Sequence, residues 1–189
     1  MGPTRYFDEL AAVFRGVEAT RGCGSPLGLV EGIEQAIAMV TSCAGAGRKV
    51  IFIGNGGSAA IASHQAVDYW KNGGIRAIAF NDSSLLTCIS NDYGHPHVFE
   101  KPVEMFADEG DVLIAISSSG RSENILRAVK AGQAKGCDLI TLSGFKPDNP
   151  LRPLGRVNFY AASTSYGHVE ITHLALCHCI VDTIIERRA

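Results

Sequence analysis

The sequence lacks the features that mark several large classes of protein. Its longest apolar runs are too short or too interrupted to span a bilayer, and its first fourteen residues lack the charged-then-apolar layout of a signal peptide. Its 17 basic residues form no stripe and are outnumbered by 19 acidic residues, for a net charge of −2. We therefore expect a cytoplasmic protein that binds neither membranes nor nucleic acid.

The sequence also contains no internal repeat, linker or low-complexity segment. With 189 residues, 46% of them hydrophobic, the chain is long and apolar enough to bury a full core without disulfides. We interpret its six cysteines as reduced thiols. Cys177 and Cys179 flank His178, but residues two apart on a helix point to nearly opposite sides, so we do not expect them to share one metal ion.

Hydrophobic periodicity divides the chain into helices and strands. It predicts helices from Thr4 to about Ala19, from Leu29 to Cys43 and from about Val169 to Arg187, with a break at residues 22–26. Between them, short apolar runs alternate with helical stretches, which predicts βαβ units and a parallel sheet. The five runs are residues 50–53, 75–80, 112–116, 139–142 and 157–161. We expect one compact α/β unit, with a helical extension (1–46) that contacts a partner subunit and a sheet domain (47–189).

A glycine-rich loop follows the first of these strands. Residues 54–58 read Gly-Asn-Gly-Gly-Ser, directly before a predicted helix. Glycines let the backbone approach a ligand closely, and a helix N-terminus offers free N–H groups. The spacing fits neither a Rossmann fingerprint nor a Walker loop, so we expect no nucleotide cofactor. A plain tight turn is the other interpretation of this loop.

A serine-rich loop follows the third strand. Residues 117–122 read Ser-Ser-Ser-Gly-Arg-Ser, and together with backbone amides the hydroxyls would form a good phosphate cradle. One serine would serve as a helix cap, but four are hard to explain in that way. We therefore favour phosphate binding.

These two loops, GNGGS and ISSSGRSEN, in this order and context, resemble the sugar isomerase (SIS) domain of phosphosugar isomerases and phosphosugar-binding proteins. Residues 81–99, NDSSLLTCISNDYGHPHVF, resemble the phosphoheptose isomerases, which turn sedoheptulose 7-phosphate into a heptopyranose 7-phosphate. The resemblance covers almost the whole chain. It implies a three-layer αβα sandwich around a five-stranded parallel sheet, preceded by a helical hairpin, and a homotetramer with active sites between subunits.

The resemblance also implies roles for individual residues. The phosphate would be held by Ser117, Ser118, Ser119 and Ser122. The sugar would be bound by Asn55, Gly56, Ser58 and Asp92.

A second group of polar residues lies on the predicted helices. His64 and Asp68 are four apart and share one face, and Glu170 and His178 are eight apart, about 80° around the helix axis, so they can line one broad face. If the four converge, two imidazoles and two carboxylates suit zinc or a similar divalent ion. The resemblance implies the same site, since some heptose isomerases bind zinc at the matching positions.

The chain departs from the family pattern at two of these positions. Asp68 stands where the family usually has a catalytic Glu, and Glu170 stands where it has Gln. The shorter Asp side chain shifts its carboxylate, and a displacement near 1 Å can cost about a hundredfold in rate. The extra negative charge of Glu170 would strengthen metal binding, and its carboxylate would give the substrate a further contact.

The predicted reaction is the interconversion of a ketose phosphate and an aldose phosphate through an enediol, with Asp68 and His178 as acid–base residues. Sedoheptulose 7-phosphate is the expected substrate, and the two departures leave room for another sugar phosphate. A non-catalytic phosphosugar-binding or regulatory tetramer is the alternative. It would need the serine loop but not the imidazoles and carboxylates.

Overall fold

The computed structural model describes residues 2–188. Within them, seven strands form one sheet in the order β2-β1-β7-β6-β5-β3-β4. The strands are β1 (Glu18–Arg21), β2 (Pro26–Leu27), β3 (Val50–Gly54), β4 (Ala77–Ala79), β5 (Val112–Ser117), β6 (Asp138–Gly144) and β7 (Val157–Ala161). The five neighbouring strands β7, β6, β5, β3 and β4 are all parallel, whereas β1 pairs antiparallel with both β7 and β2.

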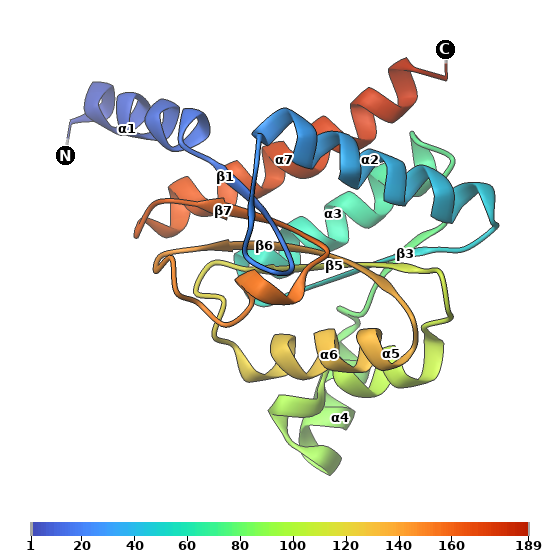
Figure 1. Cartoon of the computed structure of the whole chain (residues 1–189). Coiled ribbons are helices and arrows are strands. Elements are labelled where there is room, and N and C mark those ends of the chain that lie inside the picture. Colours follow the sequence, from blue (N-terminus) through green and yellow to red (C-terminus); the bar gives the residue numbers. More distant parts are fainter. Residues whose placement is uncertain (1, 189) are drawn as a thin grey trace.

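Helices cover both faces of the sheet, as Figure 1 shows. One face carries α2, α3 and α7, and the other carries α4, α5 and α6. The helices are α1 (Pro3–Arg15), α2 (Leu29–Gly45), α3 (Gly57–Lys71), α4 (Ser83–Tyr93), α5 (Glu100–Phe106), α6 (Glu123–Ala134) and α7 (Tyr166–Glu186), with short 3-10 helices η1 (His95–His97) and η2 (Arg152–Leu154). The predicted αβα sandwich is confirmed.

The alternation of side chains along the central strands explains the two layers. Val50 and Phe52 of β3 pack with α2, α3 and α7, whereas Ile51 and Ile53 pack toward α5 and α6. All four side chains are fully buried. A strand buried on both faces must be apolar throughout, which is why these strands stand out in the sequence as continuous apolar runs.

The five predicted runs form the parallel part of the sheet, but the strand count was too low. Residues 18–27, expected as the end of a helix and a break, form β1, a turn and β2 instead. β1 pairs with β7 over four residues and covers an edge that would otherwise expose unpaired backbone groups. The two leading helices are therefore separated by a β-hairpin and do not form a simple helical hairpin.

Helix α7 is long and rich in apolar residues. By length and composition alone it could cross a membrane, but half of its most apolar segment is buried inside the protein. It packs against α2, α3 and α1 as well as the sheet. Its buried residues include Val169, Leu176, Ile180 and Ile184, so packing in the core accounts for its composition.

Candidate functional site

The two loops singled out in the sequence meet at one place in the sheet. β3 and β5 are neighbours, but the chain continues from β3 to β4 on one side and from β5 to β6 and β7 on the other. The strand order therefore reverses between β3 and β5. Open α/β sheets bind ligands in the crevice beyond the carboxyl ends of the strands at such a point.

The glycine-rich loop turns sharply from β3 into α3. Gly56, the residue before α3, has φ of 53° and ψ of −122°, a backbone conformation that residues other than glycine rarely adopt. A Cβ atom on Gly54 would lie 2.5 Å from the carbonyl oxygen of Ser58. Both glycines are thus required by the turn, and the turn brings Asn55 and Ser58 to the crevice.

Two hydroxyl groups of the serine-rich loop accept hydrogen bonds from the loop's own backbone. The Oγ of Ser117 accepts the N–H of Gly120 at 3.2 Å, and the Oγ of Ser119 accepts the N–H of Arg121 at 3.2 Å. Gly120 itself has φ of 61° and packs against Asn149. These bonds fix the loop backbone around the space that it encloses.

The two remaining serines of the loop keep their hydroxyls free among the described residues. The buried Oγ of Ser118 has no hydrogen-bond partner, and Ser122 stands at the N-cap position of α6 without making a side-chain cap. Helix capping therefore does not explain this run of serines. A buried unpaired hydroxyl costs free energy, which a bound ligand with acceptor oxygens would recover.

The loops enclose a cavity of about 240 Å³. It is lined by both loops and by the start of α7: Asn55, Gly56, Gly57, Ser58, Ile116, Ser117, Ser118, Ser119, Ser122, Tyr166 and Glu170. Of the expected phosphate- and sugar-binding residues, only Asp92 is not in this lining. Gly57, Ile116 and Tyr166 were not singled out from the sequence, and Tyr166 gave no periodic signal because it begins a helix.

Glu170 places a carboxylate in this cavity. A Cβ on Gly57, the first residue of α3, would collide with the Glu170 carboxyl group. The carboxylate therefore lies against the N-terminus of α3, where the positive end of the helix dipole stabilises a negative charge. The same helix dipole would stabilise an anionic ligand bound at the N-terminus of α3. Glu170 and a phosphate group therefore compete for the same favourable electrostatic field.

The imidazole–carboxylate cluster lies further along α3 and α7. Asp68 Oδ2 is 3.2 Å from His64 Nε2 and 3.7 Å from His178 Nδ1, and the ligand atoms of all three residues lie within 4.8 Å of one another. Glu170 is not a member of this cluster. The side chains of His64 and His178 are 55% and 35% exposed, so the cluster opens to the surface.

These three residues fit a zinc ion. Zinc binds imidazole nitrogens and carboxylate oxygens at about 2.0–2.2 Å, so two ligand atoms of one tetrahedral ion lie about 3.4 Å apart. The observed separations of 3.2 and 3.7 Å are close to this value. Three protein ligands also leave one position open, as in catalytic zinc sites.

The other histidines and Asp92 lie outside both groups. Asp92 is exposed on α4, where it accepts hydrogen bonds from Asn91 at 2.8 Å and from the thiol of Cys88 at 3.6 Å. His173 is completely buried and its Nε2 bonds the carbonyl of Ser143 at 3.0 Å. Burial lowers the pKa of His173 to about 4, so it is a neutral core residue.

Comparisons with known proteins agree with this arrangement. Residues 5–144 match the family model of the SIS domain. The chain is 37% identical over 155 residues to the phosphoheptose isomerase of Cytophaga hutchinsonii, covering 79% of this chain and 81% of the relative. The chain belongs to the phosphoheptose isomerase branch of the SIS domain family. It is also 37% identical to the phosphoheptose isomerase of Serratia proteamaculans, covering 82% and 83% of the two chains.

Solved structures of this branch have the same fold. The phosphoheptose isomerase of Neisseria gonorrhoeae superposes with a TM-score of 0.84 at 32% identity, with 96% of each chain covered. That of Francisella tularensis has a TM-score of 0.84 at 27% identity, covering 97% of this chain and 96% of its own. The resemblance read from the loops is confirmed.

Proposed function

We propose that the protein is an aldose–ketose isomerase that converts sedoheptulose 7-phosphate into D-glycero-D-manno-heptose 7-phosphate. The observation that carries the proposal is the pairing of two sites on α3 and α7. A hydroxyl-lined cavity suits a phosphate, and an imidazole–carboxylate cluster suits proton transfer. A protein that only bound a phosphosugar would need the first and not the second.

The serine loop is proposed to hold the phosphate through Ser117, Ser118, Ser119 and Ser122. Asn55, Gly56 and Ser58 would contact the sugar, with Asp92 and Glu170 accepting hydrogen bonds from its hydroxyls. The free hydroxyl of Ser118 and the unused side chain of Ser122 support this assignment. Backbone N–H groups at the start of α3 add donors and a favourable dipole.

Isomerisation moves one proton between neighbouring carbons. A base takes a proton from C1 of the ketose, and the enediol that forms is protonated at C2. The oxygen on C1 loses its proton and becomes the aldehyde oxygen, and the oxygen on C2 gains a proton and becomes a hydroxyl. We assign these acid–base roles to Asp68 and His178. Alternatively, zinc held by His64, Asp68 and His178 would polarise the substrate carbonyl and stabilise the enediolate, in which case these ligands would not also serve as bases. Glu170, expected as a fourth ligand, lies in the cavity and not in this cluster, which leaves the fourth position open.

The cavity and the cluster are well separated within one chain. His64 lies seven residues beyond Gly57 on α3, about 10 Å along the helix axis. Apolar side chains beside the cluster are exposed, including Val67 at 42% and Trp70 at 54%. We infer that a homotetramer covers this surface and completes each active site with residues of two subunits.

The direct test is turnover of sedoheptulose 7-phosphate, followed by NMR. We expect the aldose to appear with the wild-type protein, and Asp68→Ala and His178→Ala to lose about 10²- to 10⁴-fold in rate. His97→Ala is the matched control, because His97 pairs with Glu100 away from the cluster. Binding of the sugar phosphate without turnover would reject the isomerase and establish a binding module.

A further inference from the structure

The side chains of Asn55 and Asn124 form a reciprocal pair. Asn55 Nδ2 donates to Asn124 Oδ1 at 2.9 Å, and Asn124 Nδ2 donates to Asn55 Oδ1 at 2.9 Å. Asn55 follows β3 and lines the cavity, whereas Asn124 is the second residue of α6 and does not. The pair thus joins the glycine-rich loop to the helix that follows the serine-rich loop.

Asn124 has no hydrogen-bonding capacity left over. Its Oδ1 also accepts the N–H of Ile125 at 2.9 Å, and its Nδ2 also lies 3.2 Å from Nε2 of His95. An amide has two N–H donors and two acceptor lone pairs, so these four contacts use all of them. Asn124 is 3% exposed, so the network is shielded from water.

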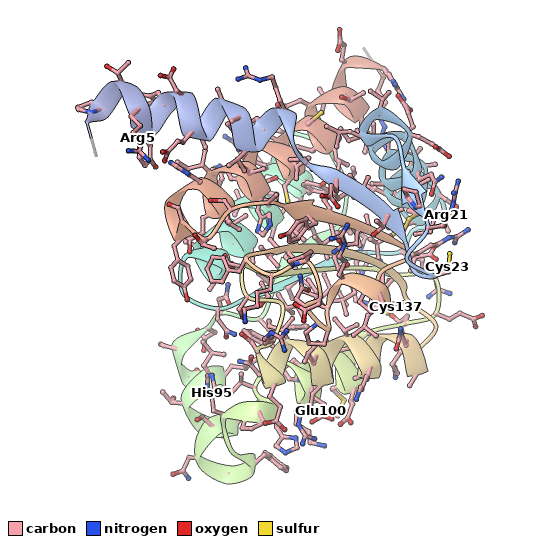
Figure 2. All side chains as sticks on the ribbon, turned by 60° about the vertical axis from the view of Figure 1, so that its left-hand side comes forward. Arg5, Arg21, Cys23, His95, Glu100 and Cys137 are labelled. Atoms are coloured by element: carbon pink, nitrogen blue, oxygen red, sulfur yellow. The ribbon has the colours of Figure 1, made fainter. Side chains whose placement is uncertain are left out.

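The contact with His95 brings in a third part of the fold. His95 belongs to η1, which continues from α4, and Figure 2 labels it in the arm below the sheet. Since the Asn124 amide nitrogen can only donate, Nε2 of His95 is the acceptor in this contact. Asn124 therefore ties together the two ligand loops and the α4–η1 arm.

We propose that Asn124 is a positioning residue for the isomerisation, which rests on the function proposed above. Its reciprocal pair fixes the plane of the Asn55 amide and leaves Asn55 one N–H and one lone pair for the substrate. Asn124 does not line the cavity, so it is not placed to contact the substrate. We infer that it acts through Asn55. If Asn124 only stabilised the N-terminus of α6, its effect on the reaction would not depend on Asn55.

A double-mutant cycle separates these two roles. Asn124→Ala is expected to lower kcat/KM by about 10- to 100-fold in the wild-type background. In the Asn55→Ala background it should change kcat/KM by less than about twofold, because the group that it positions is gone. Losses that simply multiply would overturn the proposal.

Hydrogen exchange gives a second reading that needs no substrate. The amides of residues 54–58 should exchange about tenfold faster in Asn124→Ala. The same change is expected in Asn124→Asp, which keeps the shape and the acceptor for Ile125 but loses both donors, and which stands in should the alanine variant not fold. Glu123→Gln is the control, because the Glu123 side chain pairs with Arg127 on the surface.

Unchanged exchange in both Asn124 variants would sink the positioning role even if the enzyme is confirmed. Conversely, a wild-type protein without turnover would reject the isomerase alone. The exchange measurement would then still decide whether Asn124 holds the loop.

Discussion

At the scale of single residues, Ser118 offers the sharpest contrast between folding and binding. Its hydroxyl is buried without a partner, so Ser118→Ala should leave the free energy of unfolding unchanged or raise it. A hydrogen bond to a charged phosphate contributes about 1.5–3 kcal/mol, so the affinity for sugar phosphate should fall by about 10- to 150-fold. Calorimetric titration and thermal melts measure the two effects.

Ser119→Ala is the comparison for the stability half of that prediction, since Ser119 is itself among the proposed phosphate-binding residues. Its Oγ accepts a backbone N–H, so this variant should lose about 0.5–1.5 kcal/mol of stability. A Ser118→Ala protein that melts lower and binds phosphate normally would contradict the assignment of its hydroxyl.

Much of the site could be predicted residue by residue because its signals are local. Asn55, Ser58 and the four serines follow strands directly, and all line the cavity. The role of Asn124 could not be predicted, although it ends the quoted ISSSGRSEN motif, because its partner is 69 positions away. Glu170 and His178 were expected to converge with His64 and Asp68, but eight residues rise about 12 Å along the helix axis, which leaves Glu170 beside Gly57.

At the scale of elements, the burial of α7 makes a prediction about pH. The folded-state pKa of His173 is about 4, below the unfolded value near 6.5. Between these values the unfolded chain binds a proton that the folded chain does not. Stability should therefore be intact above pH 6.5 and fall by up to about 1.4 kcal/mol per pH unit as the pH drops toward 4.

Urea unfolding of wild type and His173→Gln from pH 4 to 7 checks this prediction. Carboxylates titrate in both proteins, so the difference between their slopes isolates the histidine. Equal slopes would mean that His173 is solvated or bound to a further partner.

The elements that escaped sequence analysis are those whose signals are short. β1 has only four residues with two buried positions, and its partner β7 lies far along the chain. No residue of α4 is fully buried, and only Leu85, Leu86 and Ile89 pack partly buried against the core, so its apolar signal is short. Its start did carry a local signal, because Asp82 caps it by accepting the N–H groups of Ser84 and Leu85.

At the scale of the whole molecule, the imidazole–carboxylate cluster predicts that zinc binding raises the stability of the fold. A ligand that binds only the folded state stabilises it by about 2.7 kcal/mol at 100 times its Kd. For a chain of this size, zinc should raise Tm by roughly 5–10 °C. The shift should disappear in His178→Ala and persist in His97→Ala, which calorimetry after chelation and metal addition would show. No shift in the wild type would reject the metal site.

If active sites are shared between subunits of the proposed tetramer, inactive subunits should complement one another. Ser118→Ala would weaken phosphate binding in the cavity and His178→Ala would disable the cluster, so at low substrate concentration each variant alone should have little activity. In a mixed tetramer, roughly a quarter of the sites would combine an intact cavity with an intact cluster. Activity should reappear on co-refolding, and its absence from confirmed mixed tetramers would place each site within one subunit.

The pairing of β1 with β7 also has a consequence for the time course of synthesis. β1 ends at Arg21 and its partner begins at Val157, about 135 residues later. At about 5–20 residues per second, a ribosome needs roughly 7 to 27 seconds to make that stretch. During that interval Val17, Ala19 and Leu27, which are buried in the finished fold, have no sheet edge to cover them. β1 is thus made before every other strand of the sheet but docks only after β7 has been made, and until then it is open to chaperones and proteases.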